Sequence, residues 1–372
     1  MTAPPSPVWF DAHLDLAYME AAGRDMTALP EVAGGPDLPA AVTLPSLNSG
    51  GVRACLGTIF VEPDGTPPAI AYPSGDAESA HAAGWRQIEI YKRWEREGRI
   101  SLRSMGPRAV RSAPIVGTLN VGILIEGADP IREPSELVGW VEAGVVATGL
   151  AWAKSSRYAG GNTSDLGITD LGRRLIAEMD RLGVVHDASH LSDRAFDELC
   201  AATTRPIIAS HSNCRALVHD GRADESGVPA FQRHLKDDQI REIVRRGGVI
   251  GVNVFSPFLI RGGKRDRRAA IAEWCDHVAR VCEIAGDRVH VGLGSDMDGG
   301  FSALALPEGI DGPASMGHLL DGLRERGFSA AELTEFAWGN WARFWGLVAA
   351  VRPAPGPRTS SSPDPAGGPA RT

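Results

Sequence analysis

Short apolar runs alternate along the chain with longer amphipathic stretches, and this alternation predicts the fold. Eight of the apolar runs are rich in β-branched residues and are bounded by polar or glycine-rich segments. They lie at Val8–Leu14, Arg53–Val61, Val121–Glu126, Val145–Trp152, Val184–His190, Pro206–His211, Val249–Val254 and Val289–Asp296. Because these runs are apolar on both faces, they are typical of parallel strands that are covered by helices.

The stretches between the runs have the periodicity of amphipathic helices. They cover Ala77–Glu97, Glu136–Ala143, Thr169–Arg181, Ser192–Ala202, Asp237–Arg246, Ala269–Ala285 and Met316–Arg326. Strict alternation of eight strands with helices favours an α/β fold of the (β/α)8 TIM-barrel type over a doubly wound sheet. We expect one such domain over residues 1–351, followed by a disordered tail over residues 352–372 that is rich in Pro, Ser, Gly and Ala.

The composition narrows the possible functions. The 372 residues carry a net charge of −8, so the chain has no basic character that would favour nucleic acid. The five cysteines are odd in number and include no C-x-x-C pair, which indicates reduced thiols. No secretory signal is visible, and no apolar run reaches the length of a membrane span. These features predict a cytoplasmic protein that binds neither nucleic acid nor membrane.

Six residues that can bind metal ions or carry protons stand at the ends of predicted strands. They are His13, Asp15, Glu126, His190, His211 and Asp296. A barrel of parallel strands gathers its strand ends at one face, so residues distant in sequence can share a pair of metal ions. His13 and Asp15 are two positions apart and should project from the same face of a strand. Asp296 is placed to take a proton from a metal-activated water and pass it to a leaving group.

Each of these residues also has a structural interpretation. H-x-D is a common polar strand end, and Glu126 could cap a helix or form an ion pair, although a buried carboxylate is costly without a partner. His186 shares a face with His190, but four strand residues span about 13 Å. Both therefore cannot bind one ion, and we interpret His186 as a packing residue. Asp298 is interpreted as structural.

A basic run follows the seventh predicted strand, at the face where the strand ends should meet. It reads Arg261-Gly-Gly-Lys264-Arg265-Asp-Arg267-Arg268. Most such runs are solvated loops, but at this location the run could also attract an anionic substrate.

Taken in order, the motifs resemble the membrane-dipeptidase (renal dipeptidase) family of binuclear zinc peptidases. The resemblance runs from about Trp9 to Trp345. It is carried by Asp11-Ala12-His13-Leu14-Asp15, Glu126-Gly127, Asp187-Ala188-Ser189-His190-Leu191-Ser192, Ser210-His211-Ser212-Asn213, Gly294-Ser295-Asp296-Met297-Asp298-Gly299 and Trp338-Gly339-Asn340.

The resemblance implies a hydrolase of small dipeptides with two zinc ions per chain and a hydroxide between them. It implies that His13 and Asp15 bind one zinc, that His190 and His211 bind the other, and that Glu126 bridges both. Asp296 would then accept the proton of the hydroxide and protonate the departing amine. Arg222, eleven residues after His211, would bind the terminal carboxylate of the substrate.

One position departs from the family pattern. Trp152 stands where well-characterised members have a histidine that is thought to polarise the scissile carbonyl, and an indole can donate only through its N–H. We therefore keep two alternatives to a dipeptidase: a zinc hydrolase that cleaves another amide or a lactone, such as an N-acyl amino acid, and a catalytically silent metal-binding protein. Lys154 is a weaker candidate for a carboxylated bridging lysine, since Glu126 already fills that role. A symmetric homodimer is the default oligomer.

Overall fold

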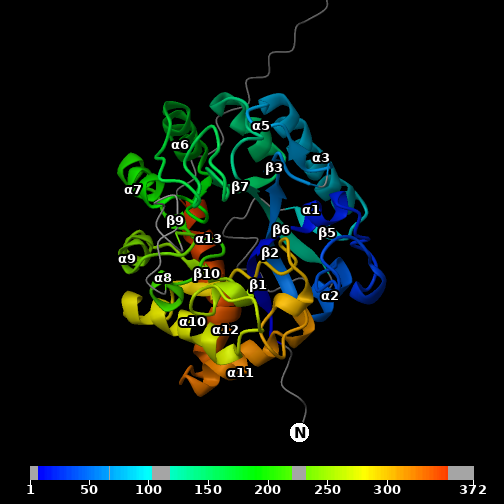
Figure 1. Ribbon diagram of the computed structural model, residues 1–372, viewed down its shortest axis with the longest axis vertical. Coiled ribbons are helices and arrows are strands. Elements are labelled where there is room, and N and C mark those ends of the chain that lie inside the picture. The colour runs from blue at the N-terminus through cyan, green and yellow to red at the C-terminus, as the bar shows by residue number, and fades with distance from the viewer. Residues whose placement is uncertain (1–6, 67, 103–117, 220–231, 351–372) are drawn as a thin grey trace, which may run out of the picture.

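Eight parallel strands form a nearly closed barrel at the centre of the molecule (Figure 1). The computed structural model describes residues 7–66, 68–102, 118–219 and 232–350. Around the barrel the strands follow the order β1 (Trp9–Leu14), β2 (Val52–Phe60), β6 (Leu119–Glu126), β7 (Val145–Gly149), β8 (Val185–Asp187), β9 (Ile207–Ile208), β10 (Ile250–Val252) and β11 (Val291–Leu293), and β11 pairs with β1.

The barrel closes between β9 and β10 through one parallel bridge, from Ala209 to Ile250. At this point the Gly251 N–H donates to the Ala209 carbonyl at 2.8 Å. The predicted (β/α)8 barrel is therefore confirmed. Three short strands lie outside the ring: β5 (Ile100–Leu102) pairs with β6, and β3 (Glu62–Pro63) pairs with β4 (Ala71–Tyr72).

All eight predicted strands are present, but several end earlier than predicted. The run predicted as Pro206–His211 is a strand only at Ile207–Ile208, and Val289–Asp296 only at Val291–Leu293. Asp296 has a φ of 60°, which no extended strand can contain. His190, His211 and Asp296 therefore lie in the loops just beyond the strands, whereas His13 and Glu126 lie at the ends of β1 and β6.

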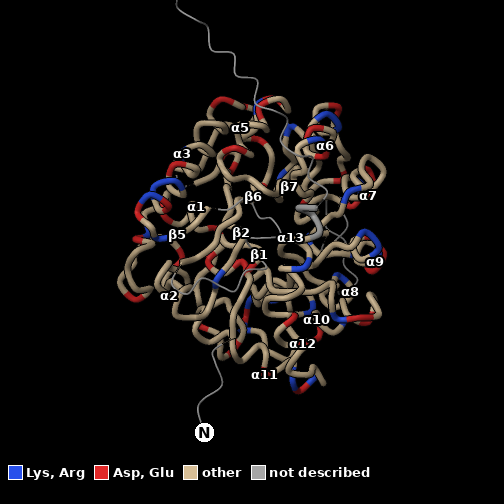
Figure 2. Tube along the Cα trace, turned by 180° about the vertical axis from the view of Figure 1, so that it is seen from behind, with Lys and Arg blue, Asp and Glu red and all other residues tan. Residues whose placement is uncertain are grey.

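Helices cover the outside of the barrel (Figure 1). α3 (Ala77–Arg96) packs against β2, α6 (Asp170–Leu182) against β8, and α10 (Ile271–Ala285) against β10 and β11. The remaining α-helices of the described residues are α1 (Leu16–Ala21), α2 (Leu44–Ser49), α5 (Leu137–Glu142), α7 (Asp193–Ala202), α8 (Arg215–Val218), α9 (Asp237–Arg245), α11 (Gly317–Glu325), α12 (Ala330–Thr334) and α13 (Asn340–Ala350). Most of the charged residues lie on these outer elements, as Figure 2 shows.

The interior of the barrel contains an apolar cluster that α13 completes. Inward residues of the strands, among them Phe10 and Leu124, pack with Trp341, Phe344 and Trp345 of α13. Trp341 stacks on Phe10 with ring centroids 5.8 Å apart. A larger cluster fills the layer between the strands and the helices. The tail predicted over residues 352–372 lies outside the described residues.

Candidate metal centre and substrate pocket

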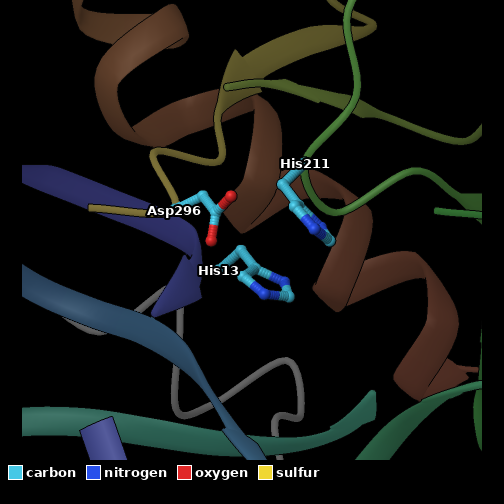
Figure 3. Close-up of side chains that lie close together, drawn as sticks. All are labelled: His13, His211 and Asp296. Carbon is cyan, nitrogen blue, oxygen red and sulfur yellow. The ribbon is translucent and has the colours of Figure 1, made fainter. Parts of the chain in front are cut away.

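The six residues predicted at strand ends lie together at one mouth of the barrel. Their ligand atoms form three overlapping groups, each within 4.8 Å: His13, Asp15 and Glu126; Glu126, His190 and His211; and His13, His211 and Asp296. Figure 3 shows the last group, in which side chains from three separate strand ends converge. All six residues are at most 8% exposed.

Glu126, the last residue of β6, occupies the middle of the cluster. Its Oε1 lies 3.0 Å from His190 Nε2 and 3.3 Å from His211 Nε2, while its Oε2 lies 3.5 Å from His13 Nε2. Asp15 Oδ1 lies 3.8 Å from the same His13 Nε2. The two oxygens of one carboxylate thus face two separate sets of ligand atoms, which is the geometry of a carboxylate that bridges two ions.

A register shift in β1 aims His13 into this cluster. Phe10 and Ala12 point into the apolar barrel interior, so strict alternation would send His13 to the opposite face. Near its end, however, β1 shifts its register against β2, and such a bulge re-aims the side chains that follow. Asp15 is no longer in the strand at all, because it is the N-cap of α1. The two side chains reach one site as expected, but the alternation argument for it was wrong.

Backbone strain marks two of the other site residues. His190 and Asp296 have φ of 68° and 60°, in the left-handed region that residues with a Cβ rarely adopt. Such strain costs on the order of 1 kcal/mol and persists where the surrounding structure enforces it, as at functional sites. Close to Asp296, a Cβ on Gly299 would lie 1.9 Å from the Asp296 carboxylate, so this approach requires glycine.

One hydroxyl, that of Ser210, orients two of the candidate ligands. Ser210 Oγ lies 3.1 Å from His13 Nδ1, 2.8 Å from His211 Nδ1 and 2.5 Å from Asp187 Oδ2. A carboxylate oxygen can only accept, so the single hydroxyl proton goes to Asp187. Both Nδ1 atoms must then donate to Ser210, so the Nε2 atom of each imidazole has its lone pair facing the site when the ring is neutral. This is the outer-shell arrangement by which proteins fix the tautomer of metal-binding histidines.

The Nε2 lone pairs of the three histidines are placed to bind a cation. His190 Nδ1 lies 2.9 Å from Asn162 Oδ1, an acceptor, so its Nε2 is also unprotonated. Yet His190 Nε2 and His211 Nε2 stand 3.0 Å apart, which would be repulsive without a cation near both. His13 Nε2 is buried and has no hydrogen-bond partner among the described residues. Imidazole nitrogens and carboxylate oxygens are the donor set of zinc, and these residues fit such ions.

The electrostatics also show an excess of buried negative charge. Burial alone would lower the pKa of His13, but Glu126 and Asp15 outweigh it and raise that pKa to about 10. Burial and the neighbouring Glu126 raise the pKa of Asp15 to about 6. Burial likewise raises the pKa of Asp296 well above its usual value, and Asp15 adds to the effect. Bound cations would relieve this repulsion between carboxylates.

A pocket of about 320 Å³ opens onto the cluster. Its aromatic lining includes Tyr18, Phe60 and Trp152, and Asp296 and Glu126 lie at its floor with the histidines. Trp152 meets Phe60 edge to face at 5.0 Å and stands 6.0 Å from the His190 ring. Trp152, the residue at which the sequence departs from the family pattern, therefore lies directly in the pocket wall.

The structure also brings in an arginine that sequence reasoning missed. Arg233 lines the pocket and is 9% exposed. Its Nη2 donates to the His211 carbonyl at 2.7 Å and its Nη1 to Ser212 Oγ at 3.2 Å. Arg222, the arginine predicted for the substrate carboxylate, lies outside the described residues. The only available signal for Arg233 was an arginine shortly before α9, which is not distinctive.

Three further residues take up positions away from the cluster. His186 Nε2 lies 2.7 Å from Asp180 Oδ1, so this histidine has its own carboxylate partner. Asp298 forms a buried ion pair with Arg24 and accepts from the backbone N–H of Val42 at 2.7 Å. Lys154 donates to the Pro63 carbonyl at 2.9 Å and is half exposed.

Comparisons with known proteins agree with this geometry. Residues 6–355 match the family model of membrane dipeptidase, peptidase family M19. The chain is 32% identical over 228 residues to an uncharacterized protein in the pqqA 5′ region of Klebsiella pneumoniae, covering 59% of this chain and 78% of that protein. It is 28% identical over 226 residues to an uncharacterized dipeptidase of Schizosaccharomyces pombe, covering 59% of this chain and 51% of that protein.

Solved structures show the same fold. A metallopeptidase from Rhodobacter sphaeroides, solved with a phosphinate mimic of the dipeptide L-Ala-D-Ala, has a TM-score of 0.77 at 24% identity, covering 91% of this chain and 99% of that one. A metallopeptidase described as dipeptidase AC has a TM-score of 0.78 at 24% identity, covering 91% and 98%.

A buried histidine–carboxylate cluster at the mouth of a parallel barrel is typical of metal-dependent hydrolases. Within that class, the chain belongs to the membrane dipeptidase family, peptidase family M19, and is a hydrolase of the metallopeptidase type. No helix in the described ranges has the length and apolar character needed to cross a membrane.

Proposed function

We propose that this protein is a binuclear zinc dipeptidase that hydrolyses the peptide bond of small dipeptides. The observation that carries the proposal is the convergence of three imidazole Nε2 atoms on the two oxygens of Glu126, at 3.0 to 3.5 Å. In this assignment His13 and Asp15 would hold one ion, His190 and His211 would hold the other, and Glu126 would contribute to both.

Bound zinc ions would lower the pKa of a water between them and polarise the scissile carbonyl. The carboxylate of Asp296 takes the proton of the attacking water and gives it to the departing amine. Burial beside Asp15 raises the pKa of Asp296, which suits a group that must hold a proton for part of the cycle. Asn253 Nδ2 donates to Asp296 Oδ2 at 2.8 Å and so fixes the orientation of the carboxylate.

Arg233 is the best placed of the described residues to bind the terminal carboxylate of a dipeptide. Its guanidinium is fixed by two hydrogen bonds, while its buried Nε has no partner among the described residues. A guanidinium suits a carboxylate because both are planar and can form paired hydrogen bonds. The pocket volume of about 320 Å³ also suits a dipeptide better than a folded protein segment.

Metal analysis combined with a substrate panel tests the proposal. Protein purified without chelator should contain two zinc ions per chain and should hydrolyse dipeptides with L-L or L-D configuration. Activity with less than one metal per chain would contradict the binuclear mechanism. Inactivity toward every free dipeptide in the fully loaded protein would contradict the dipeptidase assignment.

The two arginine candidates can be separated by mutation. We expect Arg233→Met to raise KM for dipeptides about 10- to 100-fold, because a charge-assisted pair is lost at a buried position. Arg222→Met serves as the matched variant. If Arg222→Met raises KM instead and Arg233→Met does not, the carboxylate is bound by Arg222, as the sequence predicts.

Trp152 favours a second candidate, the hydrolysis of another amide or of a lactone. Its side chain cannot carry charge beside the carbonyl, and it adds apolar surface to the pocket wall. Assays of alanine-type dipeptides against their N-acylated forms distinguish the candidates. A dipeptidase requires the free amino group, whereas preference for the N-acylated form would support the second candidate.

A further inference from the structure

One wall of the substrate pocket contains two arginines whose guanidinium groups pack over phenylalanine rings. Phe255 and Phe258, in the segment after β10, meet edge to face with ring centroids 4.9 Å apart. The guanidinium of Arg233 lies over Phe258 and that of Arg265 over Phe255, each 5.3 Å from the ring centroid. Cation–π attraction therefore helps to hold both cations at this wall.

Arg265 differs from Arg267 and Arg268, two other arginines of the basic run that follows β10. Arg267 forms a two-pronged ion pair with Glu273, at 2.6 and 2.7 Å. Arg268 donates to the carbonyls of Leu306 and Pro307 and lies 3.0 Å from Asp311. No carboxylate of the described residues stands within ion-pair distance of Arg265, which lines the pocket. Its positive charge is therefore available to a ligand.

The two arginines place positive charge on one wall of the pocket. Glu126 is assigned to the metal ions and Glu62 lies 3.5 Å from Lys154 Nζ, so neither carboxylate serves as the counter-charge of this wall. The carboxylates of a bound dipeptide are therefore attracted toward the arginine wall.

A dipeptide with neutral side chains has only one carboxylate, which needs only one guanidinium. Arg233 is the buried member of the pair, so it takes the α-carboxylate, and Arg265 is left without a counter-charge. We propose that Arg265 selects dipeptides whose C-terminal residue is aspartate or glutamate, by pairing with the side-chain carboxylate. This inference rests on the proposed dipeptidase function and names its substrate class.

The expected selectivity is moderate. Arg265 is exposed, so solvent screens the pair and limits its strength. We expect Ala-Asp to exceed Ala-Asn, and Ala-Glu to exceed Ala-Gln, by about tenfold in kcat/KM, as for a charge-assisted pair at a partly exposed position. Both configurations of the C-terminal residue should be assayed. Asp-Ala and Asn-Ala place the acid on the other residue and should differ little or in the opposite sense.

The decisive variant is Arg265→Gln, which removes the charge but keeps a polar side chain of similar length. It should abolish the preference, so that the ratio of kcat/KM for Ala-Asp to that for Ala-Asn falls to about one. Arg267→Gln is the matched control, because it removes the same charge from the same run but outside the pocket. It should keep the preference, and added salt should weaken the preference in both the wild type and this control.

Two outcomes overturn the inference. The first is hydrolysis of neutral dipeptides without any preference for the acidic ones, which leaves the dipeptidase assignment intact. The second is a preference that survives Arg265→Gln. If no dipeptide is hydrolysed, calorimetric binding of Ala-Asp and Ala-Asn to the zinc-loaded protein still decides the matter. If Ala-Asp binds more tightly than Ala-Asn and Arg265→Gln abolishes the difference, the charge selection by Arg265 holds even though the dipeptidase assignment has failed. Equal binding of the two dipeptides would reject the charge selection.

Discussion

At one end of the barrel the strands surround histidines and carboxylates, whereas at the other end the same strands surround aromatic rings. Glu126 ends β6 at the polar mouth, while Leu124, two residues earlier, belongs to the apolar interior. At the opposite end Trp341 and Trp345 of α13 fill the barrel and are fully buried. The interior thus changes from apolar packing to charged groups within a few residues along each strand.

The two ends of the barrel have different roles: the apolar end contributes to folding stability, and the polar end contains the candidate metal ligands. The apolar end is stabilised mainly by burial, at about 25 cal/mol per Å² of apolar surface. At the polar end, burial and the Glu126 carboxylate raise the pKa of Asp15, and burial and Asp15 raise that of Asp296, so this end depends on cations for its charge balance. Changes at the polar mouth should therefore alter metal binding and turnover, and changes at the apolar end should alter folding.

The largest effect on turnover is expected from Asp296→Asn. The amide keeps the shape of the carboxylate but cannot accept the proton, so kcat should fall by about 10³-fold, within the usual range for a lost acid–base group. Metal content, measured by elemental analysis, should stay at the wild-type value. Turnover close to that of the wild type would remove Asp296 from the proton-transfer role.

The largest effect on stability is expected from Trp341→Ala at the apolar end. The ring is fully buried, donates its Nε1–H to the Leu293 carbonyl at 3.0 Å, and packs where a Cβ on Gly292 would lie 2.5 Å from Nε1. Truncation should lower the free energy of unfolding by about 3–5 kcal/mol, measured by denaturant titration.

Val32→Ala, at a position that is 76% exposed, is the control for Trp341→Ala and should change stability by less than about 0.5 kcal/mol. The folded fraction of Trp341→Ala should bind zinc as the wild type does. Weaker zinc binding by that fraction would show that the two ends are not independent.

A pH titration tests a buried hydrogen bond near the polar mouth that involves no candidate metal ligand. His277 in α10 accepts the N–H of Cys214 at its Nδ1, 3.0 Å away, and burial lowers the pKa of His277 from 6.5 to about 4. The unfolded chain therefore binds a proton below pH 6.5 that the native protein does not bind until about pH 4. Stability should fall as pH drops through this window, by about 3 kcal/mol from this group.

The measurement is the difference in pH dependence between wild type and His277→Gln, both followed by denaturant unfolding. Glutamine can still accept the Cys214 N–H but cannot become charged, so the variant should lose less stability between pH 6.5 and 4. Equal pH dependence in the two proteins would show that His277 is protonated in the native state.

The fold and the candidate ligands were accessible from sequence for a simple reason. Buried parallel strands are near-continuous apolar runs, and a barrel places whatever ends them at one mouth. That rule brings His190, His211 and Asp296 to one mouth, while their individual roles are implied by the family resemblance. The register shift that aims His13 depends on the pairing of β1 with β2, which no local pattern encodes.

The pocket wall could not be predicted for a related reason. Arg233, Arg265 and the rings of Phe255 and Phe258 lie in loops, where the direction of a side chain is set by tertiary contacts and not by periodicity. The basic run was noticed in the sequence, but only the structure shows which of its arginines lines the pocket. Substrate selectivity is therefore the property least accessible from sequence here.

The smallest effect concerns the orientation of ligands at the polar mouth, through Asp187→Asn. Asp187 Oδ1 accepts the N–H groups of Ser189 and Ser210, so in the variant the amide nitrogen would face Ser210 Oγ and donate to it. The Ser210 proton would then point to His13 or His211, which would have to protonate its Nε2 and lose its ligand lone pair. Zinc affinity should fall about 10- to 100-fold, measured by competition with a chromophoric chelator.

Asp180→Asn is the matched control, since it alters the carboxylate partner of His186 outside the centre and should leave zinc affinity unchanged. Equal zinc affinity in Asp187→Asn and the wild type would show that Ser210 does not set the two tautomers.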